Sequence, residues 1–378
     1  MTKINEFGSG SYLPSDVTVL LEVVDRASVM DVPTVQKEAL IQSGQRHYSE
    51  MLTLETAPTP EHLALYQLAL DNGKNRMAAE IDNLTATLAA IFNNKINTDQ
   101  PLILVSLVRA GLPIGVLLQR ALNENKVPSR HFGLSILRGR GLDLAALQLI
   151  LQNFPKSPIV FVDGWTGKGA IYDELAKSLS PFNDPNQDHF SQIFHQGNNV
   201  IPLLTLADPA GVAWLSASSD DWLIPSGLLN STVSGLISRS LLSAEPSRLH
   251  RCIIYDDLKN ADKSLDFIDQ VDSERQQLTQ SPIILPTYSQ PRYATKAIIV
   301  ELANQYHISN RNRIKPTIAE ATRAILRRDP DRVLLAAVAH PDTALLRHLC
   351  AARGIAVDVV GDFILPYQAI TLIKQRAT

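Results

Sequence analysis

The segment at residues 159–171, Ile-Val-Phe-Val-Asp-Gly-Trp-Thr-Gly-Lys-Gly-Ala-Ile, constrains the fold of this chain more than any other. Its first four residues are apolar and predict a buried strand that ends at Asp163. Three glycines follow within the next six positions: Gly164, Gly167 and Gly169. They allow positive φ values and a close approach of the backbone to a ligand. A helix over 170–179 would point its first N–H groups back into this loop, so the segment predicts an α/β unit with an anion-binding loop at the carboxyl edge of its sheet.

The glycine spacing differs from two familiar phosphate-binding patterns. A P-loop requires G-x-x-x-x-G-K-[ST] and a dinucleotide-binding turn requires G-x-G-x-x-G, whereas these glycines are three and then two positions apart. Thr166 and Lys168 add a hydroxyl and a cation to the backbone donors. The loop is therefore predicted to bind a phosphate in another way. The alternative is a glycine-rich connection that binds no ligand.

A second strand-turn-helix segment lies earlier in the chain. Residues 102–107 are apolar apart from Ser106, and a turn at 108–115 leads into an apolar helix at 116–122. Arg109 in this turn carries a planar set of donors that suits a diphosphate. The alternative is that Arg109 caps a carbonyl or pairs with an acid at the edge of the sheet.

Two further arginines lie between these segments. A predicted strand at 131–137 is followed by Arg138-Gly-Arg140-Gly. Such a flexible basic segment would close over a diphosphate or form an ordinary solvated hairpin.

The sequence predicts several structural units. Strands alternate with helices across 98–275, which predicts a mostly parallel sheet with helices on both faces and includes an expected strand at 222–229. Residues 1–97 are predicted to be mainly helical, with helices at 16–24, 34–52 and 61–94. Residues 276–291 contain several glutamines and prolines and predict a linker. Residues 292–378 predict a small α/β domain, with helices at 295–306, 317–328 and 343–353 and strands at 332–337 and 356–360.

Composition excludes several classes of protein. The chain has 378 residues, 45% of them hydrophobic, which suffices for large cores, and no apolar run approaches the ~18 to 20 residues of a membrane span. The first 30 residues lack the pattern of a signal peptide. Cys252 and Cys350 are the only cysteines, so the sequence supports neither a disulfide framework nor a cysteine-rich metal site. We expect a cytoplasmic protein without a membrane partner.

The net charge of −3 hides an asymmetry between two parts of the chain. Residues 283–378 hold 13 Lys/Arg against 7 Asp/Glu, so residues 1–282 hold 22 against 31. A basic module on an acidic body suits a polyanion such as RNA, because Lys and Arg neutralise phosphates. The same excess also occurs on ordinary solvated helices.

The strand that ends in Asp163 and enters a Thr/Gly-rich loop resembles the phosphoribosyl-diphosphate (PRPP) loop of type I phosphoribosyltransferases, with Gly164 in place of the second acid of the usual pair. Over nearly its full length the chain is similar to a bacterial family of tellurium-resistance and stress operons. That family joins a phosphoribosyltransferase-like domain to a C-terminal PELOTA-type RNA-binding domain. The motifs that carry this resemblance lie at 8–14, 16–18, 47–52, 162–169, 207–211 and 365–367. The resemblance implies a type I phosphoribosyltransferase-like parallel sheet, an N-terminal helical region and a small C-terminal PELOTA-like α/β domain.

The resemblance also implies an activity. The protein would join the ribose 5-phosphate of PRPP to a base or base-like nitrogen and release pyrophosphate. Asp163 would hold the ribose hydroxyls. The 5′-phosphate would lie on the loop that contains Gly164, Thr166, Gly167, Lys168 and Gly169. The pyrophosphate would contact the earlier loop, with Ser106, Val108, Arg109, Ala110 and Gly111. Arg138 and Arg140 would close the site.

Two other expectations concern the metal and the acceptor. Mg²⁺ would enter with PRPP and keep several waters, so no dedicated protein cage is expected. His47 and Asp208 are candidates for acceptor contacts. The alternatives are a helix histidine with satisfied hydrogen bonds and an aspartate that caps a helix.

Residues 310–316, Asn-Arg-Asn-Arg-Ile-Lys-Pro, precede the second predicted helix of the tail. In PELOTA-type domains a basic turn precedes the helix that grips bent RNA. The resemblance therefore implies that structured RNA contacts Asn310, Arg311, Arg313 and Lys315. A rival interpretation is a non-catalytic sensor of PRPP or a nucleotide that docks on structured RNA. A homodimer is compatible with the sequence.

Members of this family are also labelled cysteine proteases, the StiP family. A thiol protease needs a thiolate, a neighbouring imidazole and an oxyanion hole. His250 precedes Cys252 by two positions in a predicted strand, a spacing that does not ensure hydrogen-bond reach. Cys350 lies on the apolar face of a predicted helix. The sequence therefore favours buried cysteines and leaves proteolysis as a minor alternative.

Overall fold

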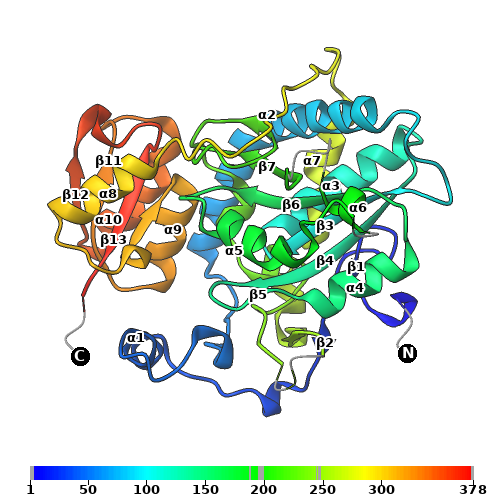
Figure 1. Cartoon of the computed structure of the whole chain (residues 1–378). Helices are drawn as coiled ribbons and strands as arrows, with labels where there is room; N and C mark the ends of the chain where they lie inside the picture. Colours follow the sequence, from blue (N-terminus) through cyan, green and yellow to red (C-terminus); the bar gives the residue numbers. More distant parts are fainter. Residues whose placement is uncertain (1–3, 187–188, 195–199, 244, 246–247, 376–378) are drawn as a thin grey trace.

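The computed structural model describes residues 4–186, 189–194, 200–243, 245 and 248–375. Its larger part is built on a central sheet (Figure 1). In spatial order the main strands are β1 (Thr18–Val19), β4 (Ser129–Leu137), β3 (Leu102–Val108), β6 (Ile159–Trp165), β7 (Leu203–Ala207) and β8 (Leu215–Ser218). Every pairing along this path is parallel, and the short β5 (Gly141–Leu142) lies antiparallel to β4. The predicted mostly parallel α/β fold is confirmed.

Helices cover both faces of the sheet, because β3 and β6 are apolar on both sides. Alternate residues such as Leu104 and Val105 belong to different cores. One face packs against α2 (Pro60–Phe92), α3 (Gly111–Glu124) and α7 (Ser264–Gln276). The other packs against α4 (Leu144–Asn153), α5 (Ala170–Leu179) and α6 (Phe190–Ile193).

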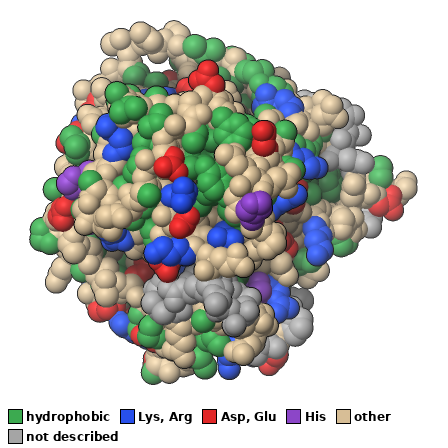
Figure 2. Space-filling model, turned by 90° about the vertical axis from the view of Figure 1, so that its left-hand side faces the viewer, with side chains coloured by type: hydrophobic (Ala, Val, Ile, Leu, Met, Phe, Trp, Pro, Cys, Tyr) green, Lys and Arg blue, Asp and Glu red, His purple; other side chains and the backbone are tan. Residues whose placement is uncertain are grey.

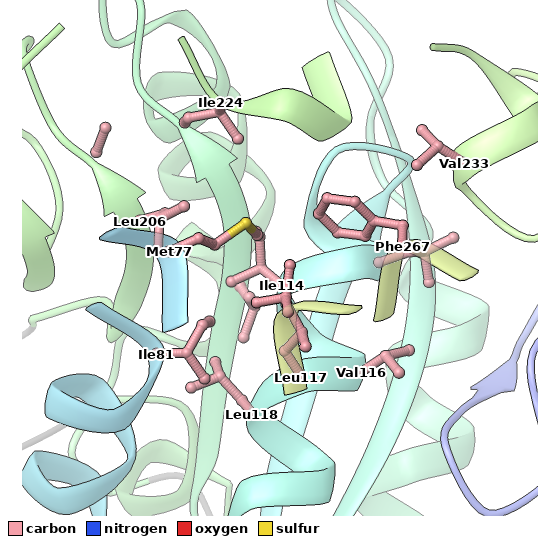
Figure 3. Packing of buried hydrophobic residues seen from close by; sticks show 14 of the residues in the cluster. Met77, Ile81, Ile114, Val116, Leu117, Leu118, Leu206, Ile224, Val233 and Phe267 are labelled. Carbon is pink, nitrogen blue, oxygen red and sulfur yellow. The ribbon is translucent and has the colours of Figure 1, made fainter. Parts of the chain in front are cut away.

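The core between α2, α3 and the sheet is the broadest. Figure 3 shows Met77 and Ile81 of α2 facing Ile114 and Leu118 of α3, with Leu206 of β7 beside them. All five are fully buried. Each such side chain contributes about 1.5–3 kcal/mol through removal from water. This packing fixes the sheet whose carboxyl edge carries the predicted ligand loops.

The N-terminal region departs from the prediction at residues 16–24. The expected helix is wrong: this stretch forms β1 and β2 (Glu22–Val23), and β2 pairs with β9 (Arg251–Cys252). The apolar side chains here meet an open sheet edge, and β1 extends the central sheet beside β4. The expected helix at 34–52 is shorter, α1 (Thr34–Gln42).

The expected helix at 61–94 is confirmed as α2. The hydroxyl of Thr59 accepts from the His62 N–H at its start, and Pro60 occupies its first turn. The strand expected at 222–229 is wrong. That segment is a buried loop with a short 3-10 turn, Pro225–Gly227, which packs against α2 and α9.

The C-terminal part is a four-stranded sheet with helices. Its order is β10 (Ile314–Pro316), β13 (Ala369–Ile373), β11 (Pro330–Leu335) and β12 (Ala356–Val359). β11 and β12 are parallel and the other two pairings antiparallel. The helices are α8 (Lys296–Gln305), α9 (Ile318–Arg327) and α10 (Ala344–Arg353). The predicted small α/β domain is confirmed, with β10 and β13 as strands that the sequence did not indicate.

This domain packs directly against the larger part, with α9 innermost (Figure 1). The buried Asp221 carboxylate, which follows β8, accepts from the N–H of Ile318 at the start of α9 and from that of Gln368. The segment that connects the two parts is hydrogen-bonded to α2: Ile283 N donates to Asn83 Oδ1 and Leu285 N donates to Thr87 Oγ1. In the described residues, no helix is long and apolar enough to cross a membrane.

Candidate functional site

The strand order creates a crevice at the carboxyl edge of the sheet. The strand β4 lies beside β3 on one side and β6 lies beside it on the other, and the helices that follow β3 and β6, α3 and α5, pack on opposite faces of the sheet. Ligands of open α/β sheets bind at such a switch point. A cavity of about 250 Å³ lies there, called the smaller cavity below. Nine predicted site residues line it: Val108, Arg109, Ala110, Arg138, Asp163, Thr166, Gly167, Lys168 and Gly169.

The loop after β6 retains unpaired backbone donors. Gly169 is the N-cap of α5 with φ of 82°. The N–H of Thr166 donates to Ala207 O, but no acceptor in the described part of the chain pairs with the N–H groups of Gly167, Lys168 and Gly169. These groups and the amino end of a ten-residue helix favour an anion.

Only one of the three loop glycines has the expected positive φ, Gly169. A glycine is needed at position 164 because the loop after β3 lies so close: a Cβ there would lie 3.1 Å from Ala110 O. Gly164 itself does not line the cavity. Its lack of a side chain lets the two loops approach each other.

Asp163 lies near the end of β6 and lines the smaller cavity, and 9% of its surface is exposed. Its Oδ1 accepts from the N–H of Gly164 at 2.8 Å, and no cation among the described residues forms a salt bridge with it. Burial raises the pKa of this carboxyl to about 7, although the Arg323 guanidinium opposes the shift. The carboxyl is thus available to a ligand that donates hydrogen bonds.

Thr166 and Asp208 brace the loop rather than contact a ligand through their polar atoms. Thr166 Oγ1 donates to Asp208 Oδ1 at 2.5 Å and accepts from Ala210 N. The Asp208 carboxylate also accepts from the N–H groups of Val212 and Ala213. Asp208 is 1% exposed and lines neither cavity, so the acceptor role expected for it does not fit its position. It organises the turn between β7 and β8, so it does not cap a helix as the alternative expected.

Lys168 joins the loop to the C-terminal domain. Its Nζ donates to Arg311 O at 2.7 Å and Ile314 O at 2.9 Å. Burial and the neighbouring Lys315 lower its pKa to about 7. In the same contact, the Tyr367 hydroxyl donates to Gly167 O at 2.6 Å. The loop after β6 is therefore part of a domain interface, which the sequence did not reveal.

The loop after β3 contributes its backbone and Arg109. The Arg109 guanidinium pairs with Glu55 Oε1 at 2.7 Å and donates to Ile237 O. Ser106 is fully buried: its Oγ donates to Gly111 O and bonds His131 Nε2 at 2.7 Å. Ser106 and Gly111 line neither cavity, so the pyrophosphate contacts expected of them do not fit. Gly111 instead allows this loop to pack against Val162 of β6.

Of the two arginines predicted to close the site, Arg138 alone lines it. Its Nη1 donates to Asn312 Oδ1 of the C-terminal domain at 3.0 Å. Arg140 lies outside both cavities, 3.6 Å from Glu50 Oε1. The hairpin turns at Gly139 and Gly141, both with positive φ, which directs Arg140 away.

His47 also lies outside both cavities. Its Nδ1 bonds Ser49 Oγ at 2.7 Å and accepts from Ser49 N, so it caps a short 3-10 turn. Its neighbour Tyr48 lines a larger cavity of about 770 Å³ and accepts from the Arg138 N–H. The acceptor role expected for His47 therefore does not fit. Its ring is hydrogen-bonded as the alternative expected, but it lies at the start of a 3-10 turn and not in a helix.

Sequence reasoning missed three arginines of the smaller cavity. They are Arg239, Arg323 and Arg327. Arg323 and Arg327 are one turn apart on α9, and Arg323 lies over the ring of Trp165 at 5.5 Å. Burial lowers the pKa of Arg239 and of Arg323 to about 10, and neighbouring arginines add to this. The spacing on α9 was the one available signal, because nothing in the sequence placed that helix beside the sheet.

The residues predicted to bind RNA lie beside the larger cavity. Lys315 and Asn312 line it. Arg311 is exposed, Asn310 Oδ1 accepts from Asn312 N, and Arg313 Nε donates to Ile373 O. On the outward face of this domain, Lys and Arg side chains lie in small groups beside acidic ones (Figure 2).

Both cysteines are buried, Cys252 1% and Cys350 0% exposed. Burial raises the pKa of Cys252 to about 12 and that of Cys350 to about 11. The His250 ring bonds Ser135 Oγ, and no imidazole of the described residues is within hydrogen-bond distance of either sulfur. Neither thiol has the surroundings of a nucleophile.

We expect neither cysteine of the native protein to react with iodoacetamide at pH 8. A pKa near 11 leaves about one thiol in a thousand ionised there, and burial excludes the reagent. Mass spectrometry should find both cysteines labelled after denaturation in urea and below a tenth labelled before it. Stoichiometric labelling of either one in the native state would contradict this account.

Comparison with known proteins identifies the family. Residues 10–272 match the family described as "Tellurite-like stress resistance cysteine protease StiP". The chain belongs to the StiP family. The predicted resemblance is confirmed, and residues 293–375 match the PELOTA RNA-binding domain.

Individual proteins are similar as well. A StiP-family protein of Acinetobacter baylyi, named "Cysteine protease StiP", is 46% identical over 381 residues, which covers 97% of this chain and 94% of that protein. The hypoxanthine phosphoribosyltransferase of Trypanosoma cruzi is 12% identical with a TM-score of 0.29 and covers 40% of this chain and 82% of its own. An asparagine mutant from an analysis of an invariant aspartic acid in HPRTs has a TM-score of 0.27 at 12% identity and covers 38% and 75%.

Proposed function

We propose that this StiP-family protein is a PRPP-dependent phosphoribosyltransferase whose C-terminal PELOTA domain binds RNA. The observation that supports the transferase most is the pairing of two features at the switch point. The N–H groups of Gly167 to Gly169 lack partners in the described chain, and the Asp163 carboxyl lies beside them without a salt bridge. A sugar phosphate has the phosphate for the first feature and the hydroxyls for the second.

The proposed reaction depends mainly on charged groups positioned around the leaving diphosphate and the anomeric carbon. The bond from the anomeric carbon to the diphosphate breaks and its electron pair leaves with pyrophosphate, while the acceptor nitrogen donates its lone pair to that carbon and releases its proton to water. Four of the five described arginines that line the smaller cavity would hold the departing negative charge: Arg109, Arg138, Arg239 and Arg323. Asp163 would orient the ribose and stay close to the carbon that becomes positive.

Magnesium fits this site only as a companion of the ligand. No group of three His, Cys, Asp or Glu side chains in the described residues is arranged to hold a metal ion. Asp163 and Glu320 are the carboxyl groups that line the smaller cavity. Mg²⁺ would bind to the diphosphate and keep waters, with Asp163 as the adjacent protein oxygen, and would supply further neutralisation of the leaving group.

A protease activity, suggested by the name of the Acinetobacter relative, has no support from the two thiols. The sensor is the stronger rival, because Lys168 links the phosphate loop to Arg311 O and Ile314 O of the PELOTA domain. Through this contact, a ligand bound to the loop would change the conformation of the residues proposed to bind RNA.

Pyrophosphate release separates the transferase from the sensor. The protein would be incubated with PRPP, Mg²⁺ and panels of nucleobases, nucleosides and nucleotides. We expect release above background that falls at least tenfold in Arg323→Gln and is unchanged in Arg130→Ala, an exposed arginine at the opposite end of β4. Binding of PRPP without release for any acceptor would favour the sensor.

For the PELOTA domain we expect that Arg311→Ala combined with Arg313→Ala weakens binding to structured RNA by tenfold or more. Two lost cations should also make the slope of log affinity against log salt shallower by roughly two. Filter binding over a salt series measures both. Arg332→Ala is the control, because Asp331 and Asp358 already pair with that arginine. An unchanged affinity and slope in the double variant would place the RNA elsewhere.

A further inference from the structure

The larger cavity opens from the smaller one. The two share five lining residues: Arg109, Arg138, Ile171, Arg239 and Arg327. The larger cavity, about 770 Å³, is walled by the N-terminal region, the loop at 229–232 and the PELOTA helices α9 and α10. A molecule bound there would lie beside the ligand of the smaller cavity, as an acceptor must.

The wall of the larger cavity is strongly cationic. Eight Lys and Arg residues line it: Lys37, Arg109, Arg138, Arg239, Lys315, Arg327, Arg328 and Arg353. Among the described residues, Glu55 and Glu61 are the carboxylates that line it. Glu55 already pairs with Arg109, and Glu61 pairs with His348. This charge suits a ligand with phosphates and disfavours a neutral base.

One of these cations has an unfilled donor. Arg327 Nη2 is buried and has no hydrogen-bond partner among the described residues. Burial and the neighbouring Arg323 lower the pKa of Arg327 well below its usual range. A crowded guanidinium with an unused donor at a cavity wall costs free energy that a bound phosphate would offset.

The loop at 229–232 supplies a second, uncharged feature. Asn230 Oδ1 and Ser231 Oγ are buried at this wall without hydrogen-bond partners in the described chain. The Ser231 N–H is held by Glu55 Oε2 at 2.8 Å, which fixes the loop. An amide and a hydroxyl that have no hydrogen-bond partner suit the polar edge of a base, which carries donors and acceptors. The cavity therefore offers phosphate donors on one side and base-edge partners on another.

We propose that the acceptor is a nucleotide unit, a nucleoside that carries phosphate, with its phosphates at Arg327, Arg328 and Arg353 and its base toward Asn230 and Ser231. This inference rests on the proposed transferase function. The unit comes either from a free nucleotide or from an end of an RNA chain. The second source is consistent with Lys315 and Asn312, which belong to the PELOTA domain and line the same cavity.

Calorimetric titration without PRPP tests the ligand class. The probes are uracil, uridine, uridine 5′-monophosphate and a 5′-phosphorylated oligouridylate trimer, with the adenine series in parallel. We expect at least one phosphorylated probe of a series to bind tenfold or more tighter than its nucleoside. Arg353→Ala and, separately, Arg328→Gln should remove most of that difference, and Arg130→Ala should not. Equal affinity for nucleosides and their phosphates would overturn the inference.

The same titrations distinguish a free nucleotide from an RNA end. Together with pyrophosphate release and PRPP binding, they also distinguish a failure of this inference from a failure of the proposed function. Tight binding of the trimer but not the monophosphate indicates an RNA end, and equal binding indicates free nucleotides. Pyrophosphate release supported by free bases as well as by nucleotides would overturn the inference and leave the transferase standing. Failure to bind PRPP would remove the transferase, while nucleotide binding that depends on Arg353 would still support the ligand class of this cavity.

Discussion

Asp163→Asn is expected to weaken PRPP binding about a hundredfold. The carboxylate is the group proposed to accept from the two ribose hydroxyls, and hydrogen bonds to a charged group are worth about 1.5–3 kcal/mol each. Asparagine keeps one acceptor oxygen, so the loss of one such bond, roughly 2.7 kcal/mol, corresponds to a factor of about one hundred. Quenching of tryptophan fluorescence measures the affinity, because Trp165 lines the smaller cavity.

The same substitution should leave the fold intact. Burial raises the pKa of Asp163 to about 7, so ionisation destabilises the native state as pH rises from about 4, the unfolded pKa, towards 7. A neutral amide avoids that cost. Unfolding in urea at pH 7 should therefore show Asp163→Asn at least as stable as wild type. Asp99→Asn, in an exposed loop, is the matched control. A variant at Asp163 that binds PRPP within threefold of wild type would contradict the proposed role.

Gly111→Ala is expected to destabilise the protein by about 3 kcal/mol and to abolish PRPP binding. A Cβ at this position would lie 2.2 Å from Val162 O and 3.3 Å from the Cα of Asp163. Both neighbours are backbone of a buried strand, so the loop or the strand must move. Such a movement displaces Asp163 from the cavity.

Urea unfolding and the fluorescence titration measure the two effects of Gly111→Ala. Gly8→Ala is the control, because a Cβ there would meet nothing within 4 Å and its φ is ordinary. It should cost below 1 kcal/mol and bind PRPP normally. A stable Gly111→Ala protein with unchanged affinity would show that the contact between the two loops does not position the site.

The central sheet and the glycine-rich loop after β6 were predictable because their signals are local. A run of four apolar residues before Asp163 and a glycine at the start of α5 are consequences of strand burial and helix geometry. The strands β1 and β2 were not predictable, because each has two residues and forms only against a partner distant in sequence. Propensity within residues 16–24 carries no information on that partner.

The candidate site was predictable where its residues lie in loops that follow predicted strands, which includes Arg109 and Arg138. Gly167 to Gly169 and Asp163 follow each other in the chain, whereas Arg239, Arg323 and Arg327 reach the cavity through tertiary packing. Ser106 shows the opposite case. Its position at the end of β3 suggested a ligand contact, but the side chain points into the core toward His131.

Calorimetric titration of the wild-type protein with PRPP and Mg²⁺ tests the central claim most directly. We predict one site per chain with a dissociation constant below 1 mM, and competition by inorganic pyrophosphate and by ribose 5-phosphate, which each fill one half of the site. The absence of measurable heat and of competition at millimolar PRPP would contradict it, because the unpaired amides beside Asp163 would then have another purpose.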